Sequence, residues 1–178
     1  MLKIKIHAKR FPSKLRVAMM AMCHHAFKEL GVSNRIKNSM TLNIHLRHHV
    51  SEGEAYLADE ANVYRPKEFV VILDHHRILI DDYGREKGDL EWAHDMLKIL
   101  AHELVHVKDY VLGNLAMRKV GMVYRGVTFD AETLLDYFKL PYEIEAYGRE
   151  KGLLVSFLIF WNSIESELGL LGDDEIDG

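Results

Sequence analysis

The sequence predicts an α+β fold in which a small mixed sheet packs against two long helices. Two observations support this prediction. Segments 2–6 and 40–48 alternate apolar and polar residues, as strands with one solvated face do. Segments 89–112 and 142–168 instead repeat apolar residues at helical spacing. A chain of 178 residues that is 48% hydrophobic is long enough to bury one core.

The N-terminal part is predicted to contain a strand, a helix and a second strand. Residues 2–6 alternate apolar and basic side chains and form the first strand. Ser13 begins a predicted helix that runs to about Leu30 and ends at Gly31, because glycine tolerates the backbone conformation that follows a helix. Alternation over 40–48 then predicts the second strand.

The middle of the chain is predicted to complete the sheet. The apolar run 69–73 is typical of a buried strand. Residues 54–59 are predicted to form an edge strand that accepts an extended peptide by main-chain pairing, with an ordinary connecting loop as the alternative. After the helix over 89–112, a hairpin region is expected over 117–130, with short strands at 123–124 and 127–129.

Composition limits the function classes. The net charge is −4, from 23 basic and 27 acidic residues, which gives no support to a nucleic-acid-binding surface. The single cysteine, Cys23, excludes an internal disulfide and suits the reducing cytoplasm. The longest apolar run, 153–161, is too short to span a membrane. We expect one domain over 1–171 and a disordered acidic tail over 172–178.

A short motif in the middle of the predicted helix 89–112 points to metal chemistry. It reads His-Glu-Leu-Val-His from His102 to His106, so the two histidines stand four residues apart on one helix face. Both imidazoles can therefore bind one Zn²⁺ ion, with Glu103 as general base towards a zinc-activated water. The alternative is that ordinary core or surface contacts satisfy both histidines.

A catalytic zinc ion of this kind needs a third protein ligand. The best segment follows Pro141, a residue suited to the first turn of a helix. Glu143 and Glu145 both lie near the start of that helix. They project about 200° apart, so only one of them is expected to reach the metal.

These residues carry a resemblance to a known family. The motif at His102, followed by Pro141, Glu143, Glu145 and Ala146, resembles zincin metallopeptidases of the glutamate-ligand type, and most closely the small SprT-like proteins of tailed phages. In that group the ligand glutamate commonly stands three residues before a small alanine, which favours Glu143 over Glu145.

The resemblance is limited to residues 101–107 and 141–149, about a fifth of the chain, with a looser likeness at 124–126. Many members carry an aspartate where this chain has Tyr147, and no histidine follows His106. The resemblance implies a zincin-like fold, in which the sheet packs against the HExxH helix and a second helix carries the third ligand.

Several other side chains have candidate roles. Asp109 shares a helix face with His102 and is a candidate to orient that histidine, with an ordinary exposed acid as the alternative. One of four tyrosines is a candidate donor to a developing oxyanion, although the sequence does not choose among them. These are Tyr124, Tyr137, Tyr142 and Tyr147. The adjacent pairs His48–His49 and His75–His76 are typical of strand ends.

Together these features predict a zinc metallopeptidase that cleaves peptide bonds in a peptide or protein substrate. Zn²⁺ is held by His102, His106 and Glu143, and Glu103 is the general base. The alternatives are a zinc-binding regulatory or interaction protein without catalysis, and a metal-dependent amidase acting on a non-protein substrate. The expected location is the cytoplasm, or the host cytoplasm if a phage encodes the chain. The sequence leaves the oligomeric state open.

Overall fold

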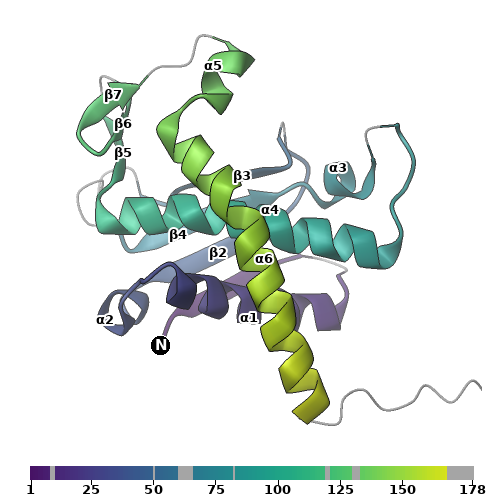
Figure 1. The fold of residues 1–178 in the computed structure, drawn as a ribbon. Coiled ribbons are helices and arrows are strands. Elements are labelled where there is room, and N and C mark those ends of the chain that lie inside the picture. The colour runs from purple at the N-terminus through teal and green to yellow at the C-terminus, as the bar shows by residue number, and fades with distance from the viewer. Residues whose placement is uncertain are drawn as a thin grey trace, which may run out of the picture.

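The computed structural model of the chain contains two sheets and six helices among the residues it describes (Figure 1). Those residues are 1–8, 11–49, 51–59, 66–81, 83–118, 121–129 and 133–167. The predicted acidic tail over 172–178 lies outside them.

The larger sheet has four strands in the order β1-β2-β4-β3. Strands β1 (Lys3–His7), β2 (Thr41–Leu46) and β4 (Glu68–Leu73) are parallel, so their carboxyl ends lie at one edge of the sheet. Strand β3 (Gly53–Leu57) is antiparallel to β4, and no described strand pairs with its other edge. This confirms an edge strand close to the predicted range 54–59. The mixed sheet of the predicted α+β fold is therefore present.

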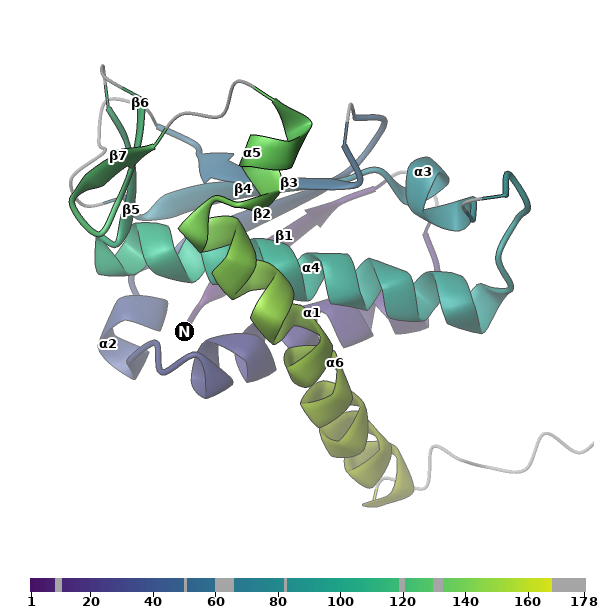
Figure 2. The same cartoon turned by 45° about the horizontal axis from the view of Figure 1, so that its top comes forward.

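Helices cover one face of this sheet (Figure 2). Helices α1 (Ser13–Glu29) and α4 (Asp89–Leu112) contact each other, and α4 also packs on β3 and β4. The predicted boundaries of α4 match the structure, and Gly113 ends it in the left-handed conformation, with φ of 73°. Two short helices, α2 (Asn34–Lys37) and α3 (His75–Leu79), follow α1 and β4.

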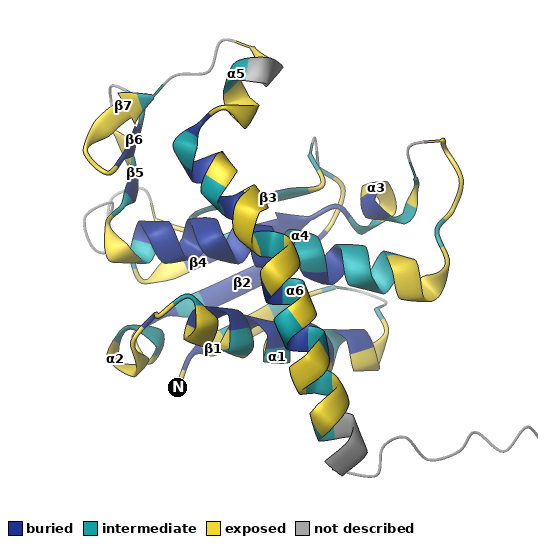
Figure 3. Ribbon diagram, in the orientation of Figure 1, coloured by how far each residue is buried: buried dark blue, intermediate teal, exposed yellow. Residues whose placement is uncertain are grey.

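Helix α6 (Pro141–Glu167) crosses over the middle of α4, and its C-terminal half extends beyond the rest of the fold (Figures 1 and 2). Short helix α5 (Leu134–Phe138) precedes it. At the crossing α4 is buried on every side, whereas α6 keeps an exposed outer face (Figure 3). Polar residues of α4 near the crossing are therefore shielded from water.

A second sheet, β5-β6-β7, follows α4 directly. Its antiparallel strands are β5 (Leu115–Arg118), β6 (Gly121–Tyr124) and β7 (Val127–Phe129). The predicted strands at 123–124 and 127–129 are confirmed as parts of β6 and β7, and β5 is an addition that sequence patterning missed. Among the described residues no helix is both long enough and apolar enough to cross a bilayer.

Candidate metal centre

Two histidine side chains of α4 meet beneath α6. His102 and His106 are each about nine-tenths buried, because α6 and the sheet enclose this part of α4. Their Nε2 atoms lie 3.1 Å apart. Helical spacing explains this approach, since side chains four residues apart stack on one face. The predicted pairing of the two imidazoles is present.

The Glu143 carboxylate completes a cluster of three. Its two oxygens lie 3.2 Å from His102 Nε2 and 3.4 Å from His106 Nε2. Four ligand atoms around one zinc ion, each at 2.0–2.1 Å, lie roughly 3.3 Å from one another. Among the described residues, His102, His106 and Glu143 are the only group of three metal-binding side chains with this convergence. The donor set therefore fits a zinc ion.

The charges within this cluster depend on one another. Burial by itself would raise the pKa of Glu143, but hydrogen bonds from His102 and His106 hold that pKa at about 2. Burial likewise opposes protonation of His102, but hydrogen bonds to Glu143 and Glu150 raise its pKa to about 9. Without a metal, a protonated imidazole thus supplies the positive charge that Glu143 requires.

Glu103 lies beside this cluster with its carboxylate buried. Burial raises the pKa of Glu103 to about 7, although the positive charges of His106 and His102 act in the opposite direction. A Cβ atom placed on Gly53 would lie only 2.7 Å from Glu103 Oε1 and from a methyl of Ile99. The start of edge strand β3 therefore passes directly against the Glu103 side chain, and any larger residue at position 53 would force Glu103 and Ile99 to shift.

Glu150 is a member of the site that the sequence interpretation missed. Its carboxylate lies 2.9 Å from His102 Nδ1 and so holds the ring with Nε2 towards Glu143. The edge of the Tyr147 ring packs on the same imidazole, with centroids 4.5 Å apart. The available signal was spacing, because Glu150 stands seven residues after Glu143 and shares its helix face. In contrast, the buried Nδ1 of His106 has no hydrogen-bond partner among the described residues.

The alternative ligand, Glu145, does not reach the cluster. One of its oxygens accepts from Lys108 Nζ at 2.7 Å, and the other accepts from the Tyr124 hydroxyl at 2.6 Å and from Arg125 at 2.9 Å. Arg149 adds a bond from the next helical turn. Burial opposes ionisation of Glu145, but Lys108 and Tyr124 hold its pKa at about 2. The structure thus separates the two glutamates, with only Glu143 beside the imidazoles.

Both roles considered for Asp109, orienting His102 and being an ordinary exposed acid, are wrong. Asp109 is fully buried, but its carboxylate contacts Lys108 Nζ at 2.8 Å and the Asn114 amide at 3.0 Å, and it makes no contact with His102. Lys108 is itself buried, and its Nζ contacts the carboxylates of both Asp109 and Glu145. This buried ion cluster joins α4 to α6 on the side of α6 that faces away from Glu143.

The four tyrosines have different surroundings. The Tyr124 hydroxyl is bound to Glu145, and the Tyr142 ring meets the edge of His106 at 5.9 Å. The Tyr137 hydroxyl interacts with Glu143, and burial together with that carboxylate raises the pKa of Tyr137. Tyr137 is 39% exposed, so this side chain combines contact with Glu143 and access to solvent. Of the four, Tyr137 is best placed to donate to a substrate oxygen.

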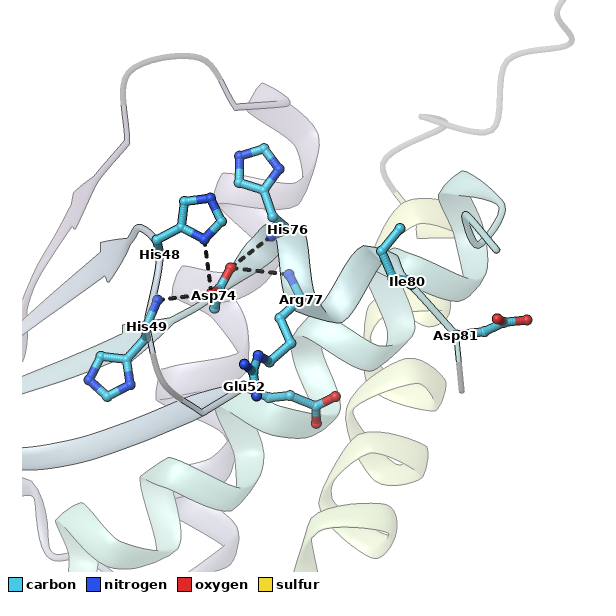
Figure 4. Close-up of a pocket in the computed structure, with 8 residues that line it drawn as sticks. All are labelled: His48, His49, Glu52, Asp74, His76, Arg77, Ile80 and Asp81. Atoms are coloured by element: carbon cyan, nitrogen blue, oxygen red, sulfur yellow. Dashed lines mark hydrogen bonds and ion pairs between the residues drawn. The ribbon is translucent and has the colours of Figure 1, made fainter. Parts of the chain in front are cut away.

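Three of the four paired histidines, His48, His49 and His76, lie together at another place, where β2 and β4 end (Figure 4). The ring of the fourth, His75, lies 4.1 Å from that of His76. Buried Asp74 accepts hydrogen bonds from the backbone N–H groups of His49, His76 and Arg77, and it contacts the His48 ring. These contacts order the turn into α3, as expected for residues at strand ends. They do not involve the three-residue cluster on α4 and α6.

No family model matches this chain, and comparisons with curated proteins and with solved structures found no match.

Proposed function

We propose that the protein is a zinc-dependent metallopeptidase of the zincin type, with Zn²⁺ held by His102, His106 and Glu143. The observation that supports this proposal is the convergence of two imidazole nitrogens and a carboxylate within a buried cluster, beside a second buried carboxylate, that of Glu103. A structural zinc site would instead be closed by cysteine ligands, and Cys23 is buried elsewhere in the core. A bound zinc ion would polarise the scissile carbonyl and lower the pKa of water.

The protein's own residues then divide the remaining work. Glu103 accepts the proton of the attacking water and passes it to the leaving amine, for which a pKa near neutrality is suited. Glu150 orients His102 through Nδ1. Tyr137 turns its hydroxyl from Glu143 to the carbonyl oxygen of the substrate.

Among the described residues no strand pairs with the outer edge of β3, and this edge is suited to hold an extended peptide. The unpaired N–H and C=O groups of an edge strand bind another strand by main-chain hydrogen bonds, which are independent of sequence. Gly53 brings the start of β3 against Glu103, so a peptide paired with this edge passes the general base. A peptide or protein substrate is therefore favoured over a small amide. We also propose that the reaction takes place in the cytoplasm, which the single cysteine suits.

The test combines metal content with hydrolysis. Native protein and Glu103→Gln, each supplied with zinc, are analysed by mass spectrometry for bound metal and incubated with a library of unstructured peptides and, separately, with small amides. Both proteins are expected to bind one equivalent of zinc, and the variant to lose activity by about 10²- to 10⁴-fold, because the general base is gone. Glu91→Gln, an exposed glutamate at the start of α4, is the control and keeps full activity.

The other outcomes separate the alternatives. Bound zinc without cleavage of any peptide or small amide would favour a regulatory protein. Cleavage of small amides alone would favour an amidase. A native protein that binds no zinc would refute the proposal.

A further inference from the structure

A cavity of about 950 Å³ opens where the parallel strands β1 and β2 end. Its apolar part is formed by Ile6, Ala8, Phe11 and Leu46. Open parallel sheets commonly bind ligands at the carboxyl ends of their strands, and the volume lies within the range of about 300–1,000 Å³ found for small-molecule sites. The cavity shares no lining residue with the cluster of His102, His106 and Glu143.

The walls of this cavity are held in place by side chains behind them. Trp92 donates from its indole nitrogen to the carbonyl of His75 at 3.1 Å, and its ring meets Phe11 edge to face at 5.7 Å. Arg16 donates to the carbonyl of Ile6 at 2.9 Å and so fixes the end of β1. Trp92 stands ten residues before His102, which places it about 15 Å along α4 from the metal centre.

The polar part of the lining is basic. It consists of Arg47, His7 and His75, and among the described residues no carboxylate lines this cavity. The Arg47 side chain is exposed and makes no hydrogen bond or ion pair with the residues that the structure describes. A guanidinium group beside an apolar surface offers a fork of donors to a phosphate or carboxylate group.

The neighbouring cavity in Figure 4 differs in charge. It also contains an arginine, Arg77, but three acids line it as well: Glu52, Asp74 and Asp81. An anion would meet these carboxylates there. Two cavities at the same end of one sheet thus offer opposite electrostatic environments, and only the one at Arg47 suits an anion.

We propose that the cavity between β1 and β2 binds a flat organic anion. Its phosphate or carboxylate group pairs with Arg47, and its apolar body lies against Phe11 and Leu46. This site is independent of the zinc centre, and its ligand need not be a substrate.

Isothermal titration calorimetry on the full chain tests the proposal with three probes that share one ring system. 1-Naphthyl phosphate and 1-naphthoate carry the two candidate anionic groups, and 1-naphthol carries neither. At least one anion is expected to bind with 1:1 stoichiometry, and at least about tenfold more tightly than 1-naphthol. The stronger of the two anions identifies phosphate or carboxylate as the preferred group.

Matched variants then locate the site. Arg47→Gln is expected to weaken the anion about tenfold or more and to leave 1-naphthol unchanged, whereas Arg77→Gln in the neighbouring cavity changes neither. Circular dichroism confirms that both variants fold. Equal binding of the anions and 1-naphthol, no binding of any probe, or undiminished anion binding by Arg47→Gln would overturn the proposal.

Discussion

Glu143 and Glu145 stand two residues apart at the start of α6 and have opposite kinds of partner. Glu143 faces two imidazoles, whereas Glu145 faces an ammonium, a phenol and two guanidinium groups. The pKa of each carboxyl is held at about 2, against the effect of burial in both cases. Both carboxyl groups are therefore ionised to the same degree, although the groups that stabilise their charges differ in chemistry.

The difference arises from α4. His106 and Lys108 are also two residues apart, so α4 presents an imidazole on one side of the crossing and an ammonium on the other. Imidazole nitrogens can lose a proton and bind a metal at neutral pH, whereas lysine cannot readily do so. The proposed zinc ion would therefore replace the direct contacts of Glu143 with the imidazoles, whereas the ammonium beside Glu145 offers a metal ion no ligand.

The largest expected effect separates the two glutamates by metal binding. Glu143→Gln is expected to abolish stoichiometric zinc binding, because an amide is a weak substitute for a carboxylate ligand. Glu145→Gln keeps the same shape and is expected to retain one equivalent of zinc. Mass spectrometry of the zinc-loaded proteins measures both. Zinc retained by the first variant and lost from the second would move the third ligand to Glu145.

The second effect concerns stability without metal. Lys108→Met removes a buried cation and leaves Asp109 with only the Asn114 amide, so the free energy of unfolding of the metal-free protein is expected to fall by about 3 kcal/mol. Urea denaturation measures the change. Arg149→Met, which removes an exposed partner of the same Glu145, is the control and is expected to cost less than about 1 kcal/mol. Equal costs would show that burial of the lysine adds nothing.

Much of this arrangement could be predicted from the sequence because it depends on local spacing. The pairing of His102 with His106 follows from the period of one helix, and α4 begins and ends where its apolar pattern does. The position of Glu143 beside the two histidines was harder to predict, because it depends on how α6 is rotated about its own axis where it crosses α4. Helical spacing predicted that only one of the two glutamates reaches the metal, and the family resemblance favoured Glu143.

The remainder depended on tertiary contacts that no local pattern encodes. Asp109 shares a helix face with His102, yet buried Lys108 binds it instead. Glu150 lies more than forty residues from His102 in the chain, so their contact exists only because α6 crosses α4. Many members of the resembling family carry an aspartate at the position of Tyr147. In this chain the Tyr147 ring packs on His102, and the carboxylate that contacts His102 Nδ1 belongs to Glu150.

A smaller expected effect, on zinc affinity, again compares the two sides of α6. Glu150→Gln removes the negative charge that orients His102 and is expected to lower zinc affinity about 10- to 100-fold without abolishing binding. Competition with a fluorescent chelator measures the affinity. Glu145→Gln is the matched control, since its carboxylate contacts no imidazole, and its affinity is expected to stay native. Equal affinities in native protein and Glu150→Gln would remove Glu150 from the site.

The smallest effect concerns one hydrogen bond on the Glu145 side. Tyr124→Phe removes one of the four donors to Glu145 and is expected to lower the free energy of unfolding by about 1 kcal/mol, because three charged donors remain. Tyr142→Phe is the matched control, since that ring packs against Tyr124 at 5.9 Å and its hydroxyl has no hydrogen-bond partner among the described residues. Thermal unfolding of the metal-free proteins measures both. Zinc affinity is expected to remain native in both variants, because Glu145 and its donors support the crossing without a hydrogen bond or ion pair to His102, His106 or Glu143. A loss of zinc affinity in Tyr124→Phe alone would show that the two sides of α6 are coupled.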